Sequence, residues 1–254
     1  MPAGDIPIRV ISLQRTPKRL AAFEQHNAHL PWSRHEAVDG ERLSAEDVAA
    51  SGLFTPAVAQ SYTAGALGCA MSHRQLWLQA AEAGEPLTIA EDDAVFRGDF
   101  PAASQALLAQ LPADWDFVLW GWNFDASLVV QLLPGVSPAA LLFDQRRLRA
   151  SLAEFQALRV PSLPLRLDKC FGIPAYTVSA AGARHLLRLC FPLTALTLRV
   201  PLIHSDVRNT GIDIAMNAAY PNLSAWACFP PLAVTPNEAE RSTVQVSAAL
   251  HTGA

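Results

Sequence analysis

The chain has 254 residues and a net charge of −4, with 51% hydrophobic and 17% charged residues. This length is enough to bury a full core, and the composition is that of an apolar globular protein, not a disordered chain. The negative charge argues against nucleic acid as a partner, because nucleic-acid-binding proteins usually carry an excess of Lys and Arg. We expect one α/β domain.

The four cysteines and the N-terminal sequence indicate the cellular compartment in which we expect the protein. The cysteines are widely spaced without a CxxC pair, which removes the usual zinc and dithiol signatures and predicts free core thiols in a reducing compartment. The N-terminus lacks the pattern of a secretory signal. Residues 186–203, the most apolar stretch, contain two Arg and two Pro and so make a poor spanning helix. We therefore expect a cytoplasmic protein, soluble or peripherally attached, without a transmembrane segment.

The first predicted elements are a strand, a helix and a second strand. Residues 8–13 (IRVISL) are typical of a buried strand, and Thr16 and Pro17 follow as the N-cap and first position of a helix. Residues 33–40 predict a short strand that ends in an Asp-Gly turn. Ser44 then begins a short helix with a pattern similar to a capping box.

The remaining elements alternate between strands and helices. The predicted strands are 86–93, 115–122 and 172–179, and the predicted helices are 64–84, 101–111 and 180–189. This alternation favours an α/β fold with a Rossmann-like, mainly parallel central sheet flanked by helices. Residues 123–168 show no clean period, and their structure stays open.

Three acids end one of these strands. In a strand, alternate side chains share a face, so Glu91 and Asp93 should project to one side and Asp92 to the other. Two carboxylates about 4 Å apart repel by roughly 4 kcal/mol at an effective dielectric near 20, and a divalent cation relieves that repulsion. Oxygen ligands select Mg²⁺ or Mn²⁺, and ligands gather at the carboxyl ends of strands in open α/β sheets. The alternative is a solvated strand-to-loop turn.

Basic residues crowd the start of the first predicted helix. Arg15, Lys18 and Arg19 lie where the helix macrodipole disfavours cations. An anionic ligand bound there would offset that penalty. The alternative is a solvated first turn, since exposed basic residues need no ligand.

The order of the segments resembles glycosyltransferase family 25, which includes bacterial lipopolysaccharide and lipooligosaccharide galactosyltransferases. Between about residues 8 and 244, the resemblance is carried by VISLQRTPKR, AVDG, GALGCAMSH, IAEDDAVF, WDFVLWG, AYTVSAAGARHLL and a late PPLAV…ST. It implies a GT-A type fold, Mn²⁺ or Mg²⁺ at the acidic motif, UDP-galactose as the usual donor and inversion at the sugar carbon. It also implies a saccharide or glycolipid acceptor, such as a lipopolysaccharide oligosaccharide, and at most a peripheral association with the cytoplasmic face of the inner membrane.

The same resemblance implies one glycosyltransferase domain over residues 1–254. Its donor-binding part would cover about residues 8–122 and its acceptor side about residues 123–254. The implied metal ligands are Asp93, in direct contact, and Glu91, which could instead meet the ribose or a metal-bound water. The implied donor-binding residues are Ser12, Arg15, Arg19, Asp39, Ser72, Glu91 and Asp92. For Asp39, a simple Asp-Gly turn is an equal reading.

Asp213 and His73 are the candidate catalytic residues. Asp213, in GIDIAMN, could accept the proton of the acceptor hydroxyl, act as a third metal ligand or cap a helix. His73 could touch phosphate or acceptor, or be a hydrogen-bonded structural residue. His204 and Asp206 are weaker substitutes for the same roles.

Three tryptophans and one alanine leave further alternatives. Trp120, Trp122 and Trp226 could stack on a sugar or on uracil, or simply fill the core. Ala66 stands where many relatives carry an acid. Because of that departure, a non-catalytic nucleotide-sugar-binding protein is one alternative function. A glycosyltransferase that acts on a peptide or protein acceptor is another. A nucleotidyltransferase lacks support, because no GxxxxGK[ST] loop is present.

Overall fold

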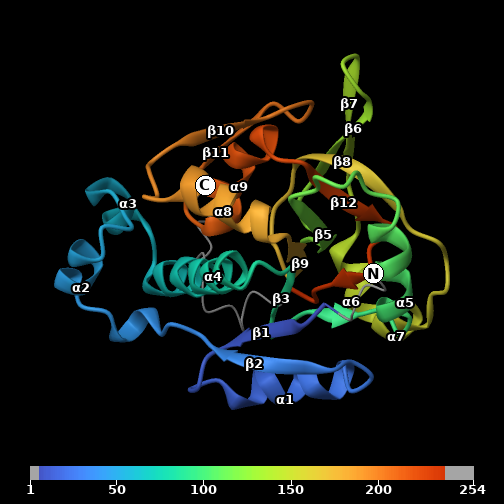
Figure 1. The fold of residues 1–254 in the computed structure, drawn as a ribbon, viewed down its shortest axis with the longest axis horizontal. Helices are drawn as coiled ribbons and strands as arrows, with labels where there is room; N and C mark the ends of the chain where they lie inside the picture. Colours follow the sequence, from blue (N-terminus) through green and yellow to red (C-terminus); the bar gives the residue numbers. More distant parts are fainter. Residues whose placement is uncertain (1–5, 238–254) are drawn as a thin grey trace, which may run out of the picture.

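The computed structural model describes residues 6–237, in which nine strands form one sheet in the spatial order β2-β1-β3-β9-β5-β12-β8-β6-β7 (Figure 1). The strands of this sheet are β1 (Ile8–Ser12), β2 (Trp32–Glu36), β3 (Leu87–Glu91), β5 (Phe117–Gly121), β6 (Leu128–Leu133), β7 (Ser137–Leu141), β8 (Leu163–Lys169), β9 (Ala175–Val178) and β12 (Ala225–Phe229). Two small sheets pair β4 (Val95–Phe96) with β13 (Ala233–Val234), and β10 (Thr197–Val200) with β11 (Ser205–Arg208). The Ser-Thr end of the late PPLAV…ST segment lies outside the described residues.

Several helix ends lie where the local signals predict, whereas the helix predicted over 101–111 ends at Leu108. They are α1 (Pro17–His26), α2 (Ala45–Ala50), α3 (Pro56–Ser61), α4 (Ala64–Ala83), α5 (Phe100–Leu108), α6 (Gln145–Ala150), α7 (Leu152–Ala157), α8 (Ala180–Cys190) and α9 (Ile212–Ala219), with 3₁₀ turns at Gly40–Arg42 and Tyr220–Asn222. Ser44 and Asp47 form a complete capping box, Ser179 caps α8, and Gly84 ends α4 in a left-handed conformation. Thr16 is the N-cap of α1, but its hydroxyl donates to a preceding backbone carbonyl instead of capping the helix.

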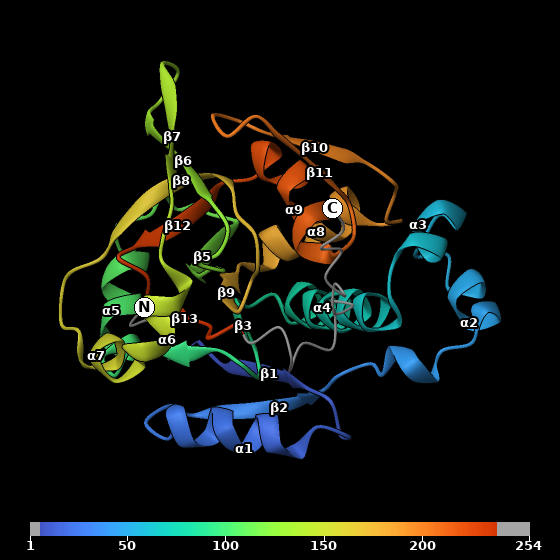
Figure 2. The same cartoon turned by 180° about the vertical axis from the view of Figure 1, so that it is seen from behind.

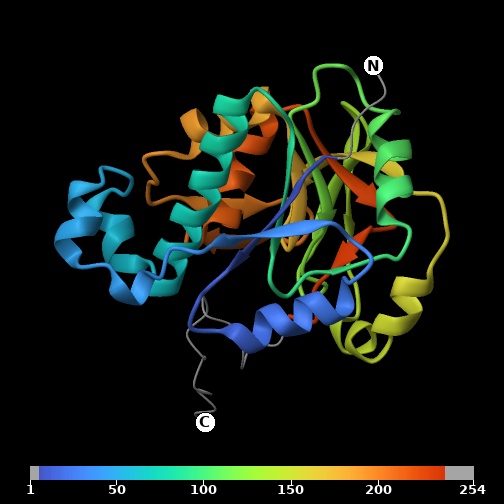
Figure 3. The ribbon, with the colours of Figure 1, turned by 60° about the horizontal axis from the view of Figure 1, so that its bottom comes forward.

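Helices cover both faces of the sheet. Helices α4, α8 and α9 pack on one face and α1 and α5 on the other, as Figures 1 and 2 show from two sides. In Figure 3, β1 and β2 run between α1 and α4. Successive residues of a strand therefore enter different cores: Ile89 joins the α4 side and Ala90 the α1 side. Because both faces are covered, the central strands are buried along their lengths.

The predicted α/β fold with a helix-flanked central sheet is confirmed, and it is compatible with the GT-A type. The pairings are more mixed than the predicted mainly parallel sheet: three neighbouring pairs are parallel and five are antiparallel. Strands β2, β1, β3, β5 and β12 share one direction, whereas β9 runs against its neighbours β3 and β5. Strands β8 and β9 are consecutive in the chain and run in the same direction, with β12 and β5 between them, so β9 enters the sheet as a reversed strand between β3 and β5.

Residues 123–168, whose structure the sequence left open, supply β6, β7, α6, α7 and most of β8. Strands β6 and β7 form a hairpin that projects from the molecule in Figure 1. Its turn contains Gly135 at φ 72°, a conformation that side chains rarely adopt. Antiparallel strands need only such a short turn, so this segment extends the sheet without a long helical period in its sequence.

The cysteine and tryptophan side chains lie mostly in the core. All four cysteines are free thiols, as predicted. Trp120 and Trp122 have no exposed surface, so they fill the core and are not sugar platforms. Trp226 is partly exposed and stacks under the guanidinium of Arg166 at 5.5 Å. Within residues 6–237, none of the helices has both the length and the apolar character needed to cross a membrane.

Gly68 allows α4 to pack closely against the loop after β2. A Cβ at this position would lie 2.3 Å from the carbonyl oxygen of Val38 and 2.7 Å from the backbone nitrogen of Gly40. Alanine usually stabilises a helix relative to glycine, but Gly68→Ala should lower the free energy of unfolding by about 1–3 kcal/mol because backbone must move. Urea denaturation measures this. Wild-type stability in Gly68→Ala would contradict the close contact.

Candidate active site

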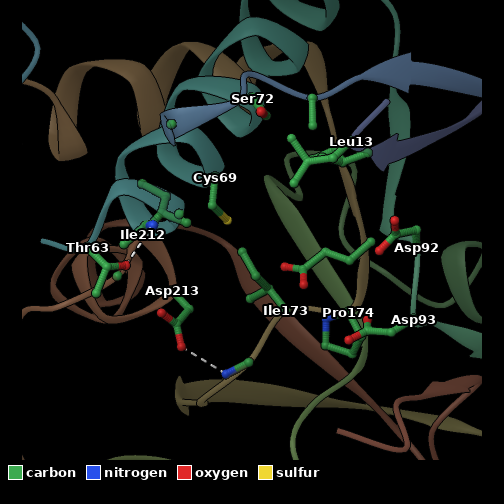
Figure 4. Close-up of a pocket in the computed structure, with 18 of the residues that line it drawn as sticks. Leu13, Thr63, Cys69, Ser72, Asp92, Asp93, Ile173, Pro174, Ile212 and Asp213 are labelled. Carbon is green, nitrogen blue, oxygen red and sulfur yellow. Dashed lines mark hydrogen bonds between the residues drawn. The ribbon is translucent and has the colours of Figure 1, made fainter. Parts of the chain in front are cut away.

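A pocket of about 480 Å³ opens at the carboxyl ends of β1 and β3. Its walls include the N-termini of α1, α4 and α9, the loop after β2 and the loop before β9. Helix N-termini carry unpaired N–H groups and a partial positive charge, which together favour an anionic ligand. Figure 4 shows Asp92 and Asp93 on one side of this pocket and Asp213, from α9, on the other.

The structure brings nine of the ten predicted site residues to this pocket. They are Ser12, Arg15, Arg19, Asp39, Ser72, Glu91, Asp92, Asp93 and Asp213. The exception is His73, which has no exposed surface and lies behind Glu91, with Nε2 3.5 Å from the Glu91 Oε1 atom. His73 is therefore placed to act on Glu91 and not directly on a ligand.

Asp92 connects β3 to β1 and α1. Its Oδ2 accepts a hydrogen bond from Ser12 Oγ at 2.8 Å, and its Oδ1 accepts from Arg19 Nε at 2.7 Å. Arg19 also approaches Asp93, with a guanidinium nitrogen 3.5 Å from Oδ2. Three predicted donor-binding residues are thus already bonded to one another, and they hold the acidic strand end against the start of α1.

Glu91 and Asp93 are the two acids at the end of β3 whose pKa values are raised. Burial raises the pKa of Glu91 to about 8. Burial and the neighbouring Glu91 raise the pKa of Asp93 to about 7, against the opposing effect of Arg19. The Oδ1 atom of Asp93 is buried without a hydrogen-bond partner. An unpartnered carboxylate oxygen beside a second acid fits a hard divalent cation such as Mg²⁺ or Mn²⁺, which would replace the proton.

Asp39 and Ser72 line the part of the pocket formed by the loop after β2 and by α4. Asp39 accepts hydrogen bonds from Arg15 Nε at 3.0 Å and from the backbone of Glu41 at 3.2 Å, so it both caps the turn and orients an arginine. Ser72 Oγ accepts from the backbone N–H of Val38 at 2.8 Å and donates to a carbonyl one turn earlier in α4. The hydroxyl of Ser72 is therefore committed to holding the loop after β2.

Asp213 lies in the first turn of α9, behind the N-cap Gly211. Its Oδ2 accepts from the backbone N–H of Gly172 at 3.0 Å, and burial raises the pKa of the carboxyl group. A carboxylate with raised proton affinity inside a ligand pocket can accept a proton from a bound hydroxyl. The weaker substitutes do not reach the pocket: His204 and Asp206 lie on the β10–β11 hairpin, where Asp206 pairs with Arg199 at 3.1 Å.

Several lining residues were not predicted: Thr63, Cys69, Asn123 and Thr235. Thr63 had a local signal, because a threonine before a helical pattern is an N-cap, and it caps α4. Cys69 lies one turn before His73 on α4. Asn123 and Thr235 come from loops after β5 and β13, and only the strand order could have placed them here.

A match to a known protein family includes most of the residues that line this pocket. The model of "Glycosyltransferase family 25 (LPS biosynthesis protein)" matches residues 5–201, which is more than half of the chain. The chain belongs to glycosyltransferase family 25. The family 25 match includes the acidic strand end, the basic start of α1 and all of α4, whereas Asp213 and Thr235 lie beyond it.

One relative among curated proteins is procollagen galactosyltransferase 1 of Danio rerio. It is 27% identical over 162 residues, which is 60% of this family 25 chain but 23% of the relative. The chain thus spans less than a quarter of the length of this relative. This similarity does not identify the acceptor of the present chain.

The stability of the ligand-free protein should fall by about 2 kcal/mol between pH 6.5 and 8. Glu91 and Asp93 keep protons in the folded state, with pKa values of about 8 and 7, that the unfolded chain has already released. The unfolded state then binds fewer protons, so the free energy of unfolding decreases as pH rises through this window. Urea denaturation with a chelator present measures the slope.

Glu91→Gln should flatten that slope, because it removes the group with the largest titration in the window. Glu82→Gln, on the exposed side of α4, is the matched control and should leave the slope unchanged. A wild-type stability that stays constant or rises between pH 6.5 and 8 would contradict the raised pKa values.

Proposed function

We propose that this family 25 protein catalyses the metal-dependent, inverting transfer of a hexose, galactose, from a UDP-sugar to a saccharide or glycolipid acceptor such as a lipopolysaccharide oligosaccharide. The observation that carries the proposal is the convergence of Glu91 and Asp93 with three helix N-termini in one pocket. A carboxylate pair and a set of N–H groups together suit a metal-bound diphosphate. Asp93 and Glu91 would hold Mn²⁺ or Mg²⁺.

The size and charge of the pocket suit a nucleotide sugar. A volume of about 480 Å³ lies within the roughly 300–1,000 Å³ of small-molecule sites. Arg15, whose side chain is 44% exposed, can reach a phosphate while Asp39 holds its Nε. Asp39 in turn is the acceptor for uracil or ribose groups. A bound divalent cation would stabilise the negative charge that grows on the departing UDP.

Asp213 is the proposed proton acceptor. The acceptor hydroxyl attacks the anomeric carbon as UDP leaves, and its proton passes to the Asp213 carboxylate. Support comes from its place on the wall away from Asp93 and from the raised pKa (Figure 4). Its bond from the backbone of Gly172 fixes one oxygen, so the carboxylate is oriented before a ligand binds.

The choice of sugar and acceptor rests on the relatives. The name of the Danio rerio protein supports galactose and also keeps a protein acceptor as the alternative. The family description supports a saccharide acceptor. We also propose one domain, whose donor part (about 8–122) and acceptor part (about 123–254) share this pocket, in a protein that works in the cytoplasm or at the cytoplasmic face of a membrane.

A donor screen tests the proposal. Purified protein is incubated with individual UDP-sugars and Mn²⁺, with oligosaccharide or peptide acceptors, and products are detected by mass spectrometry before and after chelation. Galactose transfer that the chelator removes is the expected result. Absence of both transfer and hydrolysis with every UDP-sugar, in protein that is folded by circular dichroism, would overturn the proposal.

A non-catalytic nucleotide-sugar-binding protein is the second candidate. One observation favours it: Ala66 lines the pocket, at the position where the resemblance implies an acid. Calorimetry separates the two candidates. UDP binding that ignores Mn²⁺ and survives Asp93→Ala would favour binding without catalysis.

A further inference from the structure

We propose that Trp77, Tyr176 and His73 form a buried hydrogen-bond chain that positions the Glu91 carboxylate by presenting it with the Nε2 proton of His73. The inference rests on the proposed function, in which Glu91 contacts the donor or its cation. It assigns positioning roles to Trp77 and Tyr176. His73 is likewise a positioning residue, which acts on Glu91 and does not itself contact the ligand.

The four side chains form one continuous path from the core to the pocket. Trp77 Nε1 lies 2.8 Å from the Tyr176 hydroxyl, and that hydroxyl lies 2.8 Å from His73 Nδ1. His73 Nε2 is then 3.5 Å from Glu91 Oε1. Trp77, Tyr176 and His73 have no exposed surface, and the rings of His73 and Tyr176 stack with an interplanar angle of 23°. Helix α4 supplies both Trp77 and His73, four residues apart and so on one face.

Counting donors and acceptors sets the direction of the chain. An indole N–H can only donate, so the oxygen of Tyr176 accepts from Trp77. The single hydroxyl proton of Tyr176 is then available for His73 Nδ1, which must accept it. A neutral imidazole that accepts at Nδ1 carries its one proton on Nε2. That N–H faces Glu91.

The same atoms could instead suggest a soft-metal site. Ligand atoms of Cys69, His73 and Glu91 all lie within 4.8 Å of one another. A metal on His73 Nε2 would require the proton on Nδ1, which would then donate to Tyr176. Tyr176 would accept twice and its own proton would have no acceptor among the hydrogen bonds of residues 6–237. The hydrogen-bond count thus favours the N–H over the metal.

The contact with Glu91 is longer than a formed hydrogen bond, whose usual N···O distance is roughly 2.7–3.2 Å. His73 is fixed on α4 and by Tyr176, whereas Glu91 lies at the strand end with 29% of its side chain exposed. The donor is therefore rigid and the carboxylate can adjust to it. Active-site hydrogen bonds commonly tighten only when the ligand is bound.

Ring ¹⁵N NMR tests the direction of the chain without any assay of activity. In the wild-type protein, His73 should show a protonated Nε2 and an unprotonated Nδ1. Tyr176→Phe should lose this preference, because nothing then donates to Nδ1, whereas Trp77→Phe should keep it, because Tyr176 still donates. A wild-type His73 with its proton on Nδ1 would overturn the proposal. Titration with zinc chloride alone that replaces the Nε2 proton at one equivalent would also overturn it, in favour of a metal site.

Enzyme kinetics tests the effect on Glu91. His73→Gln keeps an N–H in place of Nε2 and should retain transfer within about tenfold, whereas His73→Leu should lose about 100-fold in kcat. Thermal unfolding of both variants is recorded beside the rates. Equal rates in two folded variants would overturn the positioning role. If the wild-type protein transfers no sugar, the proposed function fails while the NMR result still decides the direction of the chain.

Discussion

Under the proposed function, Asp93→Asn should lower sugar transfer by about 10³-fold or more and remove the proposed Mn²⁺ dependence of UDP binding. Asparagine keeps the size of the side chain, but it removes the charge that would hold a cation. Rates at saturating donor and calorimetry with and without Mn²⁺ measure the two effects.

The same substitution should stabilise the ligand-free protein at pH 8. Burial and Glu91 raise the pKa of Asp93 to about 7, so its ionised form is disfavoured in the folded state. Asp114→Asn, on an exposed loop before β5, is the control and should change neither rate nor stability. A destabilised but active Asp93→Asn protein would mean that Asp93 supports the fold and holds no cation.

Under the proposed function, Asp213→Asn should lower kcat by about 10²–10⁴-fold and leave the affinity for UDP close to wild type. The amide oxygen can still accept from the backbone of Gly172, so the geometry is kept, but the group cannot take a proton. Stopped assays over a range of donor concentrations separate kcat from KM.

Asp206→Asn is the matched control for Asp213, because Asp206 is the weaker candidate for the same role and lies on the exposed β10–β11 hairpin. It should retain the wild-type rate. A loss of UDP affinity in Asp213→Asn that equals its loss of rate would instead make Asp213 a metal or donor ligand.

The sequence located the acids because strand ends have a local signature. A run of buried residues followed by Glu91, Asp92 and Asp93 is visible without any partner strand. The strand itself ends at Glu91, two residues before the predicted end, so Asp92 and Asp93 lie in the turn that follows it. The capping box at Ser44 and the glycine at Gly84 are local in the same sense, since each is decided by hydrogen bonds within one turn.

The mixed sheet was not visible in this way. The reversed direction of β9 and the antiparallel edge formed by β8, β6 and β7 depend on pairing between strands far apart in the chain. Short apolar strands with similar composition do not encode which neighbour they join. Alternation of strands and helices therefore predicted the class but not the order.

The sequence by itself determined which chemical groups gather at one end of this sheet, because residue type and position at strand or helix ends are local properties. Only the tertiary structure decided what each group does there. It committed Asp92 to Ser12 and Arg19, left an oxygen of Asp93 without a partner and put His73 behind Glu91. These outcomes depend on burial and on distances between separate elements. Burial and distance set the pKa of each group and decide whether its hydrogen bonds are formed. The spacing of residues along the chain does not predict either.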